Sequence, residues 1–119
     1  MKKENILHKK SYSFAIRVIK LSQFLNNEKK EFVLSKQVLR SGTSIGALIK
    51  ESQYAQSHAD FINKLTIALK EANETQYWIS LLYDTNYLTK EMHQSLHTDI
   101  EELLSLLISI TKILKNKSI

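Results

Sequence analysis

The chain has no cysteine and no proline, and its only glycines are Gly42 and Gly46. Without cysteine it forms neither disulfide bonds nor thiolate metal sites, which is compatible with a reducing compartment. Hairpin turns and phosphate-binding loops depend on glycine or proline at particular spacings, and none of those spacings occurs. Sustained alternation of apolar and polar residues is also absent, so the sequence predicts helices and no β-sheet.

Long hydrophobic runs are missing as well. The longest apolar segment, at 103–114, is shorter than the ~18 residues that a membrane span requires. The basic N-terminus starts as a signal peptide would, but Arg17 and Lys20 interrupt the apolar part and no small-residue cleavage site follows. We therefore expect a single domain over residues 1–119, a cytoplasmic location and no membrane partner.

Apolar residues recur at helical spacing in most of the chain. The segments cover residues 6–25, about 35–49, 61–82 and about 89–115. Polar links separate them, and Ser57, Asp60 and Thr89 are candidate N-caps of the helices that follow. Helices of roughly 22–27 residues joined by short links bury their apolar stripes best against one another. The fold prediction is an all-α, antiparallel, up-down-up-down four-helix bundle.

Positive charge is concentrated in the first third of the chain. The net charge is +5, with residues 1–40 carrying +7 and residues 41–119 carrying −2. Two interpretations stay open: a basic face that binds an anionic partner, and an ordinary solvated surface kept soluble by lysine. The candidate nucleic-acid contacts are Lys2, Lys3, Lys9, Lys10, Arg17, Lys20, Lys29, Lys30 and Lys36.

Residue patterns for catalysis or metal binding are not found. Di-iron bundles use Glu-x-x-His pairs, and none of the four histidines has an acidic residue three positions before it. His93, His97 and Glu101 share a helical face but lack a further ligand of clear spacing. Ser41 and Ser44 have no histidine near them in the sequence. We therefore predict a non-enzymatic protein with no metal and no cofactor.

The segment around the two glycines is poor in side-chain atoms. An interior glycine costs a helix ~1 kcal/mol relative to alanine, so two of them one turn apart indicate a packing role. A smooth face lets a second helix come close, either inside the bundle or between subunits. Because an apolar stripe runs beside it, the helix has two faces to bury, and we predict a homo-oligomer. The packing and oligomer residues are Ser41, Gly42, Ser44, Ile45, Gly46 and Ala47.

Charged residues also lie close to the apolar stripes. Arg40 is placed to reach a carboxylate, and the candidate partners are Glu51 and Glu74. A partly buried ion pair of this kind fixes helix register and adds little net stability. The alternative is three independent solvated charges. Trp78 fits a core position better than a platform for stacking nucleobases.

Two segments carry a family resemblance, LRSGTSIGALIKE at 39–51 and ADFINKLTIALKEANETQYWISLL at 59–82. They hold an Arg-Ser-x-x-Ser-Ile-Gly-Ala core, then an Asp-Phe pair, then a Glu-x-x-x-Trp spacing. With these motifs the chain resembles, over nearly its whole length, the four-helix-bundle proteins encoded in intervening sequences of bacterial 23S ribosomal RNA genes. Gly42 and Leu48 depart from the family pattern, which commonly has alanine or another small residue at the first position and asparagine at the second.

The resemblance implies an antiparallel bundle that assembles into a ring-like homopentamer. A related branch, the accessory proteins of diversity-generating retroelements, forms a basic pentameric barrel that binds nucleic acid and a reverse transcriptase. The intervening-sequence branch has no established biochemical role and supplies no catalytic residue. We predict an oligomeric bundle that binds nucleic acid, with RNA as the first choice. The alternative is a protein–protein scaffold or adaptor with no direct nucleic-acid role.

Overall fold

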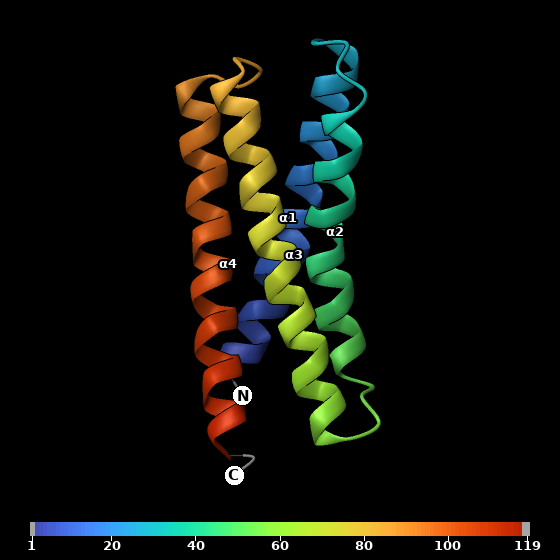
Figure 1. The fold of residues 1–119 in the computed structure, drawn as a ribbon, viewed down its shortest axis with the longest axis vertical. Coiled ribbons are helices and arrows are strands. Elements are labelled where there is room, and N and C mark those ends of the chain that lie inside the picture. Colours follow the sequence, from blue (N-terminus) through green and yellow to red (C-terminus); the bar gives the residue numbers. More distant parts are fainter. Residues whose placement is uncertain (1, 118–119) are drawn as a thin grey trace.

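The computed structural model describes residues 2–117, with side chains from residue 5 onward. The described part of the chain forms four helices and no strand, so the all-α prediction is confirmed. The helices are α1 (Lys2–Asn27), α2 (Leu34–Ser52), α3 (His58–Asp84) and α4 (Lys90–Lys117) (Figure 1). Their lengths spread more widely than expected, because α2 has only 19 residues and α4 has 28.

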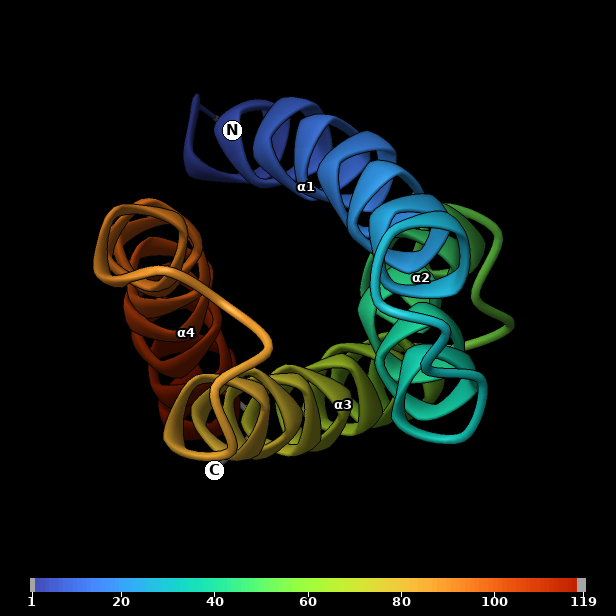
Figure 2. The same ribbon diagram turned by 90° about the horizontal axis from the view of Figure 1, so that it is seen from above.

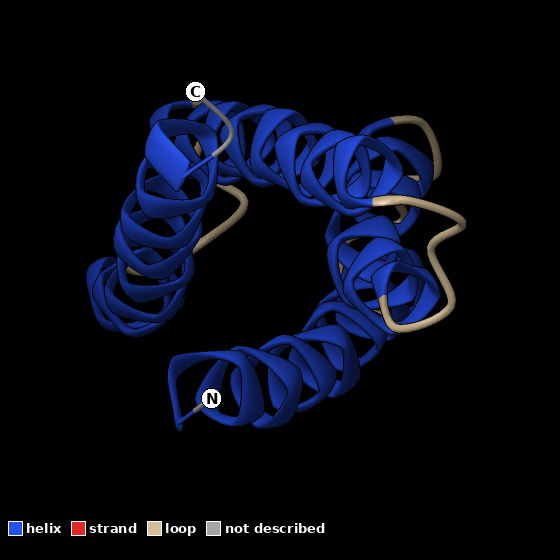
Figure 3. Cartoon of the chain, turned by 90° about the horizontal axis from the view of Figure 1, so that it is seen from below, coloured by secondary structure: helices blue, strands red, loops and turns tan. Residues whose placement is uncertain are grey.

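The helices follow one another around a long, narrow molecule of 48 × 22 × 20 Å. The chain ascends in α1 and α3 and descends in α2 and α4, so the 28–33 and 85–89 links share one end (Figure 1). Each helix packs against its two neighbours around the bundle, and α1 closes it against α4 (Figure 2). Figure 2 also shows that α1 and α4 lie further apart than the other neighbours. From below, the 52–57 connection bulges away from the bundle at its near end (Figure 3).

The core lies between the four apolar stripes. Every helix contributes side chains with almost no exposed surface, for example Phe14, Ile45, Ile79 and Ile100. The periodicity of apolar residues in the sequence places these side chains on one stripe of each helix. Burying them together is the main favourable term for this fold.

Local side chains determine where the helices begin. Ser57 Oγ accepts a hydrogen bond from the Asp60 backbone N–H at 3.0 Å, and Asp60 Oδ2 accepts one from the Gln56 backbone N–H at 3.1 Å. Thr89 Oγ1 accepts from the Met92 backbone N–H at 3.1 Å. The predicted caps at Ser57 and Thr89 are therefore present, and Asp60 lies in the first turn of α3 and bonds the Gln56 N–H rather than acting as the cap itself.

Ser57→Ala is expected to lower the free energy of unfolding by about 1 kcal/mol, because the first turn of α3 loses its side-chain acceptor. Chemical denaturation followed by circular dichroism measures the change. Ser105→Ala, at an exposed position inside α4, is the matched control, and it should be neutral or slightly stabilising. Equal effects of the two substitutions would contradict the capping role.

Candidate nucleic-acid interface

Four basic residues of α1, Lys9, Lys10, Arg17 and Lys20, line the side of this helix next to α4. The side chains between these two helices leave two hollows. The lower hollow, of about 210 Å³, is lined by Lys9, Lys10, Ser13, Phe14, Asp99 and Glu102. The upper hollow, of about 360 Å³, is lined by Arg17, Lys20, Leu21, Phe24, Met92 and Leu96. Four of the predicted contacts therefore share one edge of the molecule.

Carboxylates of α4 neutralise part of this basic edge. Lys10 Nζ lies 2.6 Å from Glu102 Oε1, and Arg17 Nη1 lies 2.7 Å from Asp99 Oδ2. Arg17 Nη1 also donates to the Ser95 backbone carbonyl at 3.2 Å. Lys10 and Arg17, two of the predicted nucleic-acid contacts, thus form ion pairs within the chain. The four side chains of these pairs are between a third and a half exposed. Lys9 and Lys20 are left with no ion pair to another described residue.

Three further candidates lie around the link between α1 and α2. Lys29, Lys30 and Lys36 are exposed, and the Lys29 ammonium lies 5.8 Å from the centre of the Phe24 ring. Lys30 has φ 54°, the left-handed conformation that usually belongs to glycine after a helix. The link therefore turns tightly on a lysine and presents its charge at the end of the bundle.

The acidic residue of this link is engaged with the backbone. Glu31 Oε1 accepts from the Ser35 backbone N–H at 2.8 Å, and Oε2 accepts from the Val33 backbone N–H at 3.3 Å. The carboxylate thereby caps α2, which has no side-chain cap at Val33. Lys2 and Lys3, the remaining predicted contacts, have side chains outside the described residues.

The small-residue strip of α2 packs inside the bundle. A Cβ atom built on Gly42 would lie 2.7 Å from both Cγ atoms of Val18, so α1 approaches here to backbone distance. A Cβ on Gly46 would meet the Ser11 carbonyl oxygen at 3.4 Å. Both glycines therefore face α1 of the same chain. This intramolecular contact accounts for them without a second subunit, so they no longer argue for an oligomer.

The other strip residues divide between core and surface. Ile45 and Ser41 are fully buried, and Ser41 Oγ accepts a hydrogen bond from Thr75 Oγ1 of α3 at 2.9 Å. Ser44 Oγ donates to the Arg40 backbone carbonyl at 2.6 Å, and Ala47 is exposed. The strip thus touches α1 with its glycines and α3 with Ser41.

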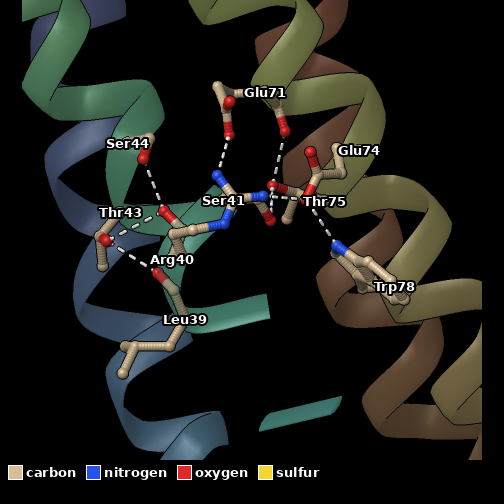
Figure 4. Close-up of polar contacts among 9 residues, drawn as sticks. All are labelled: Leu39, Arg40, Ser41, Thr43, Ser44, Glu71, Glu74, Thr75 and Trp78. Atoms are coloured by element: carbon tan, nitrogen blue, oxygen red, sulfur yellow. Dashed lines mark hydrogen bonds and ion pairs between the residues drawn. The ribbon is translucent and has the colours of Figure 1, made fainter. Parts of the chain in front are cut away.

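Arg40 joins α2 to α3 through two carboxylates (Figure 4). Its guanidinium bonds Glu74 and lies 3.2 Å from Glu71 Oε2. Glu74 Oε2 also accepts from Trp78 Nε1 at 2.9 Å. Of the two candidate partners of Arg40, the structure pairs it with Glu74, and the prediction of Glu51 is wrong. Glu51 lies eleven residues further along α2, roughly 16 Å away at 1.5 Å per residue.

Two pKa shifts accompany this cluster. The hydrogen bond from Trp78 lowers the pKa of Glu74 below its ordinary value, and contact with Arg40 lowers it further, although partial burial opposes both. The hydrogen bond to Glu74 raises the pKa of Arg40, so this guanidinium stays charged. The cluster is an ion pair whose charged form the protein favours.

Sequence reasoning missed several of these partners. Glu71 lies one turn before Glu74 and shares its helical face, so the three-residue spacing was a usable signal. Nothing local pointed to Asp99 as the partner of Arg17, because that contact joins residues 82 positions apart.

His93 stacks on Tyr83 with ring centres 4.2 Å apart. Among the described residues, no three His, Asp or Glu side chains group as a metal site.

Residues 3–109 match the family model of the 23S rRNA-intervening sequence protein. The chain belongs to this family. The match contains α2 and α3 entirely and most of α1 and α4, and it confirms the resemblance carried by the motifs. No curated protein matches this chain.

A solved structure is similar over almost the full length. It is a 1.70 Å crystal structure of a protein of unknown function from the S23 ribosomal protein family of Bacteroides thetaiotaomicron. It is 60% identical to this chain, with a TM-score of 0.91, over 92% of this chain and 98% of the other. The four-helix fold is therefore shared. None of the helices in the described part of the chain combines the length and apolar character of a membrane span.

Proposed function

We propose that this protein is a non-enzymatic, oligomeric helical bundle that binds nucleic acid, RNA first of all, through a basic surface. The observation that carries the proposal is a group of exposed lysines near one end of the bundle. This group, the basic end, consists of Lys20, Lys29, Lys30 and Lys36. None of its ammonium groups has an ion pair with a carboxylate of residues 5–117.

The charge balance at the basic end favours an anionic ligand. Glu28 and Glu31 are the acidic residues of the same segment, and the Glu31 oxygens already accept backbone N–H groups. Four ammonium groups at the end of one helix and the start of the next suit a row of phosphates. The basic end contains no visible element for reading base edges, so we expect little sequence specificity from the protein alone.

Self-association is the second part of the proposal. Tyr12, Ile16 and Ile19 follow helical spacing on α1, and they are 71%, 42% and 43% exposed. Beside them the α1–α2 seam leaves a hollow of about 380 Å³ that includes Gly46 and Ala47. A second copy of the chain that covered this stripe would remove apolar surface from water. The family resemblance suggests a ring of five copies.

A ring gathers weak sites into one surface. Each copy carries one basic end, so a strand that spans several copies binds with a high effective concentration after the first contact. Affinity should then depend strongly on salt, because each neutralised phosphate releases counterions. Assembly and nucleic-acid binding thus support each other in this proposal.

Replacement of all four lysines of the basic end by glutamine is expected to weaken RNA binding by at least about tenfold at moderate salt. For the unmodified protein, four phosphate contacts predict a loss of affinity of roughly 50-fold between about 50 and about 200 mM salt. Fluorescence anisotropy with labelled single-stranded RNA measures both quantities. Light scattering on the same samples gives the mass of the assembly.

The matched control replaces Lys70, Lys112, Lys115 and Lys117, which are also exposed, and changes the net charge equally. It should retain most of the affinity. Equal losses in the two variants would mean a general charge effect and would contradict a defined basic end. The mass of a single chain would contradict self-association.

The alternative function, a protein–protein scaffold, has its own observation. Phe32 and Val33 are 53% and 70% exposed on the link of the basic end. An apolar partner interface at this link would respond little to salt, whereas phosphate binding would weaken steeply. A partner whose binding is insensitive to salt, together with no RNA binding, would favour the scaffold.

A further inference from the structure

The upper hollow between α1 and α4 combines an apolar floor with a basic rim. Leu21 and Leu96 at its floor are 5% and 3% exposed, and Phe24 and Met92 are only partly buried. Two apolar side chains thus remain partly open to water where the neighbouring helices α1 and α4 lie furthest apart (Figure 2). A ligand that covers them gains from apolar contact.

The rim of the upper hollow is positive. Arg17 and Lys20 line it, and the Lys29 ammonium stands over the Phe24 ring. Asp99 pairs with Arg17 through Nη1, and this bond and the Ser95 carbonyl fix the guanidinium in place. Glu28 and Glu91 are exposed nearby in sequence but are not part of the lining. An anionic group is therefore the complement of this rim.

The apolar floor distinguishes between two forms of nucleic acid. A duplex presents phosphates outside and keeps its base faces stacked, so it makes no use of a recessed phenyl ring. A single strand offers a phosphate and an unstacked base together, and every base has a face that stacks on an aromatic side chain. A basic groove with an aromatic residue inside it is the arrangement that suits single strands.

We propose that the upper hollow binds an unpaired nucleotide of a single-stranded nucleic acid. The base takes the place of the Lys29 ammonium over the Phe24 ring, and the adjoining phosphates meet Lys20, the displaced Lys29 ammonium and the N–H groups of Arg17 that do not bond Asp99. This inference rests on the proposed function and goes beyond it, because it names the form of the ligand and an aromatic contact outside the basic end.

The test compares a labelled single strand of about 20 nucleotides of oligo(U) with an RNA duplex of the same length. Phe24→Leu keeps the position apolar but removes the ring. We expect it to weaken single-strand binding about tenfold, since loss of one stacked base typically costs between roughly 5- and 150-fold. Duplex binding should change less than about twofold. Phe24→Trp, which restores a stacking face, should retain single-strand affinity.

Tyr54→Leu is the matched control, because Tyr54 is 78% exposed on the link at the other end of the bundle. It should leave both affinities unchanged. Photo-crosslinking of a 4-thiouridine oligonucleotide to the unmodified protein provides a measurement that does not depend on how a variant folds. Crosslinks at Phe24 or Met92 support the inference, and crosslinks confined to other regions overturn it.

The remaining outcomes separate the two levels of the proposal. Equal loss of single-strand and duplex binding in Phe24→Leu, or no loss in either, overturns the single-strand site and leaves salt-sensitive binding by the basic end intact. No binding of either oligonucleotide at about 50 mM salt overturns both proposals. An acidic amphipathic peptide that binds the hollow in place of RNA would also overturn this inference.

Discussion

Gly42→Leu is expected to lower the free energy of unfolding by about 3 kcal/mol, because α1 has no room to yield at this position. Even a Cβ atom would lie 2.7 Å from both Cγ atoms of Val18, well inside the ~3.5–4.0 Å of a normal carbon contact. Val18 is fully buried and β-branched, and a helix strongly favours one χ1 rotamer for valine, so its methyl groups resist rotation away from the new atom. Relief requires α1 and α2 to separate along their seam.

Gly42→Ala isolates the contact from the bulk of leucine. Its steric cost is partly offset by a gain of ~1 kcal/mol in helix propensity, so we expect a net loss of about 1 kcal/mol. Combining it with Val18→Ala should make the two effects non-additive, because the smaller neighbour leaves room for the new methyl group. Chemical denaturation at a fixed protein concentration measures the free energy of unfolding of Gly42→Ala, Val18→Ala and the double variant.

Gly46→Ala is the matched control on the same face. Its Cβ would lie 3.4 Å from the Ser11 carbonyl oxygen, close to an ordinary contact, so we expect the ~1 kcal/mol gain in helix propensity to leave the free energy of unfolding unchanged or higher. Equal destabilisation by Gly42→Ala and Gly46→Ala would contradict the close approach at Val18. Full stability of Gly42→Leu would contradict it outright.

Much of the fold follows from local signals. Apolar periodicity predicts four helices, and the caps at Ser57 and Thr89 follow from residue types that accept backbone N–H groups. The start of α2 does not, because its cap is Glu31, which lies outside the helix and folds back on it. The left-handed turn at Lys30 is likewise concealed, since lysine is not a usual residue for that conformation.

The candidate site was less accessible from the sequence. Clustering of lysine before residue 40 is a property of the sequence, but which lysines stay free depends on the register between α1 and α4. That register brings Glu102 to Lys10 and Asp99 to Arg17. The upper hollow has the same origin, because Phe24 and Met92 are far apart in the sequence and line one hollow only through the packing of α1 beside α4. Contacts of long sequence separation are decided by packing, which no local pattern encodes.

Glu74→Ala is expected to lower the free energy of unfolding by about 1–2 kcal/mol at neutral pH. The substitution removes the acceptor of the Trp78 indole N–H, which is partly buried, and leaves Arg40 with Glu71 alone. Solvent screening keeps the loss in this range, since the Glu74 side chain is 35% exposed. Thermal unfolding of the two proteins measures the difference.

Glu74→Gln tests the charge of the same group by its dependence on pH. The hydrogen bond from Trp78 and the contact with Arg40 hold the pKa of Glu74 below its ordinary 4.5, so the unfolded chain takes up the proton first as pH falls. The stabilisation is complete above about pH 4.5 and is lost as pH falls through the lower pKa of the folded state. The difference in melting temperature between wild type and Glu74→Gln should therefore be constant near neutral pH and should shrink as the pH falls below about 4.5. Glu51→Gln, at an exposed carboxylate without an ion pair to another described residue, should show no such convergence. A wild-type advantage over Glu74→Gln that stays constant below about pH 4.5 would mean that the ion pair across α2 and α3 contributes through shape and not through charge.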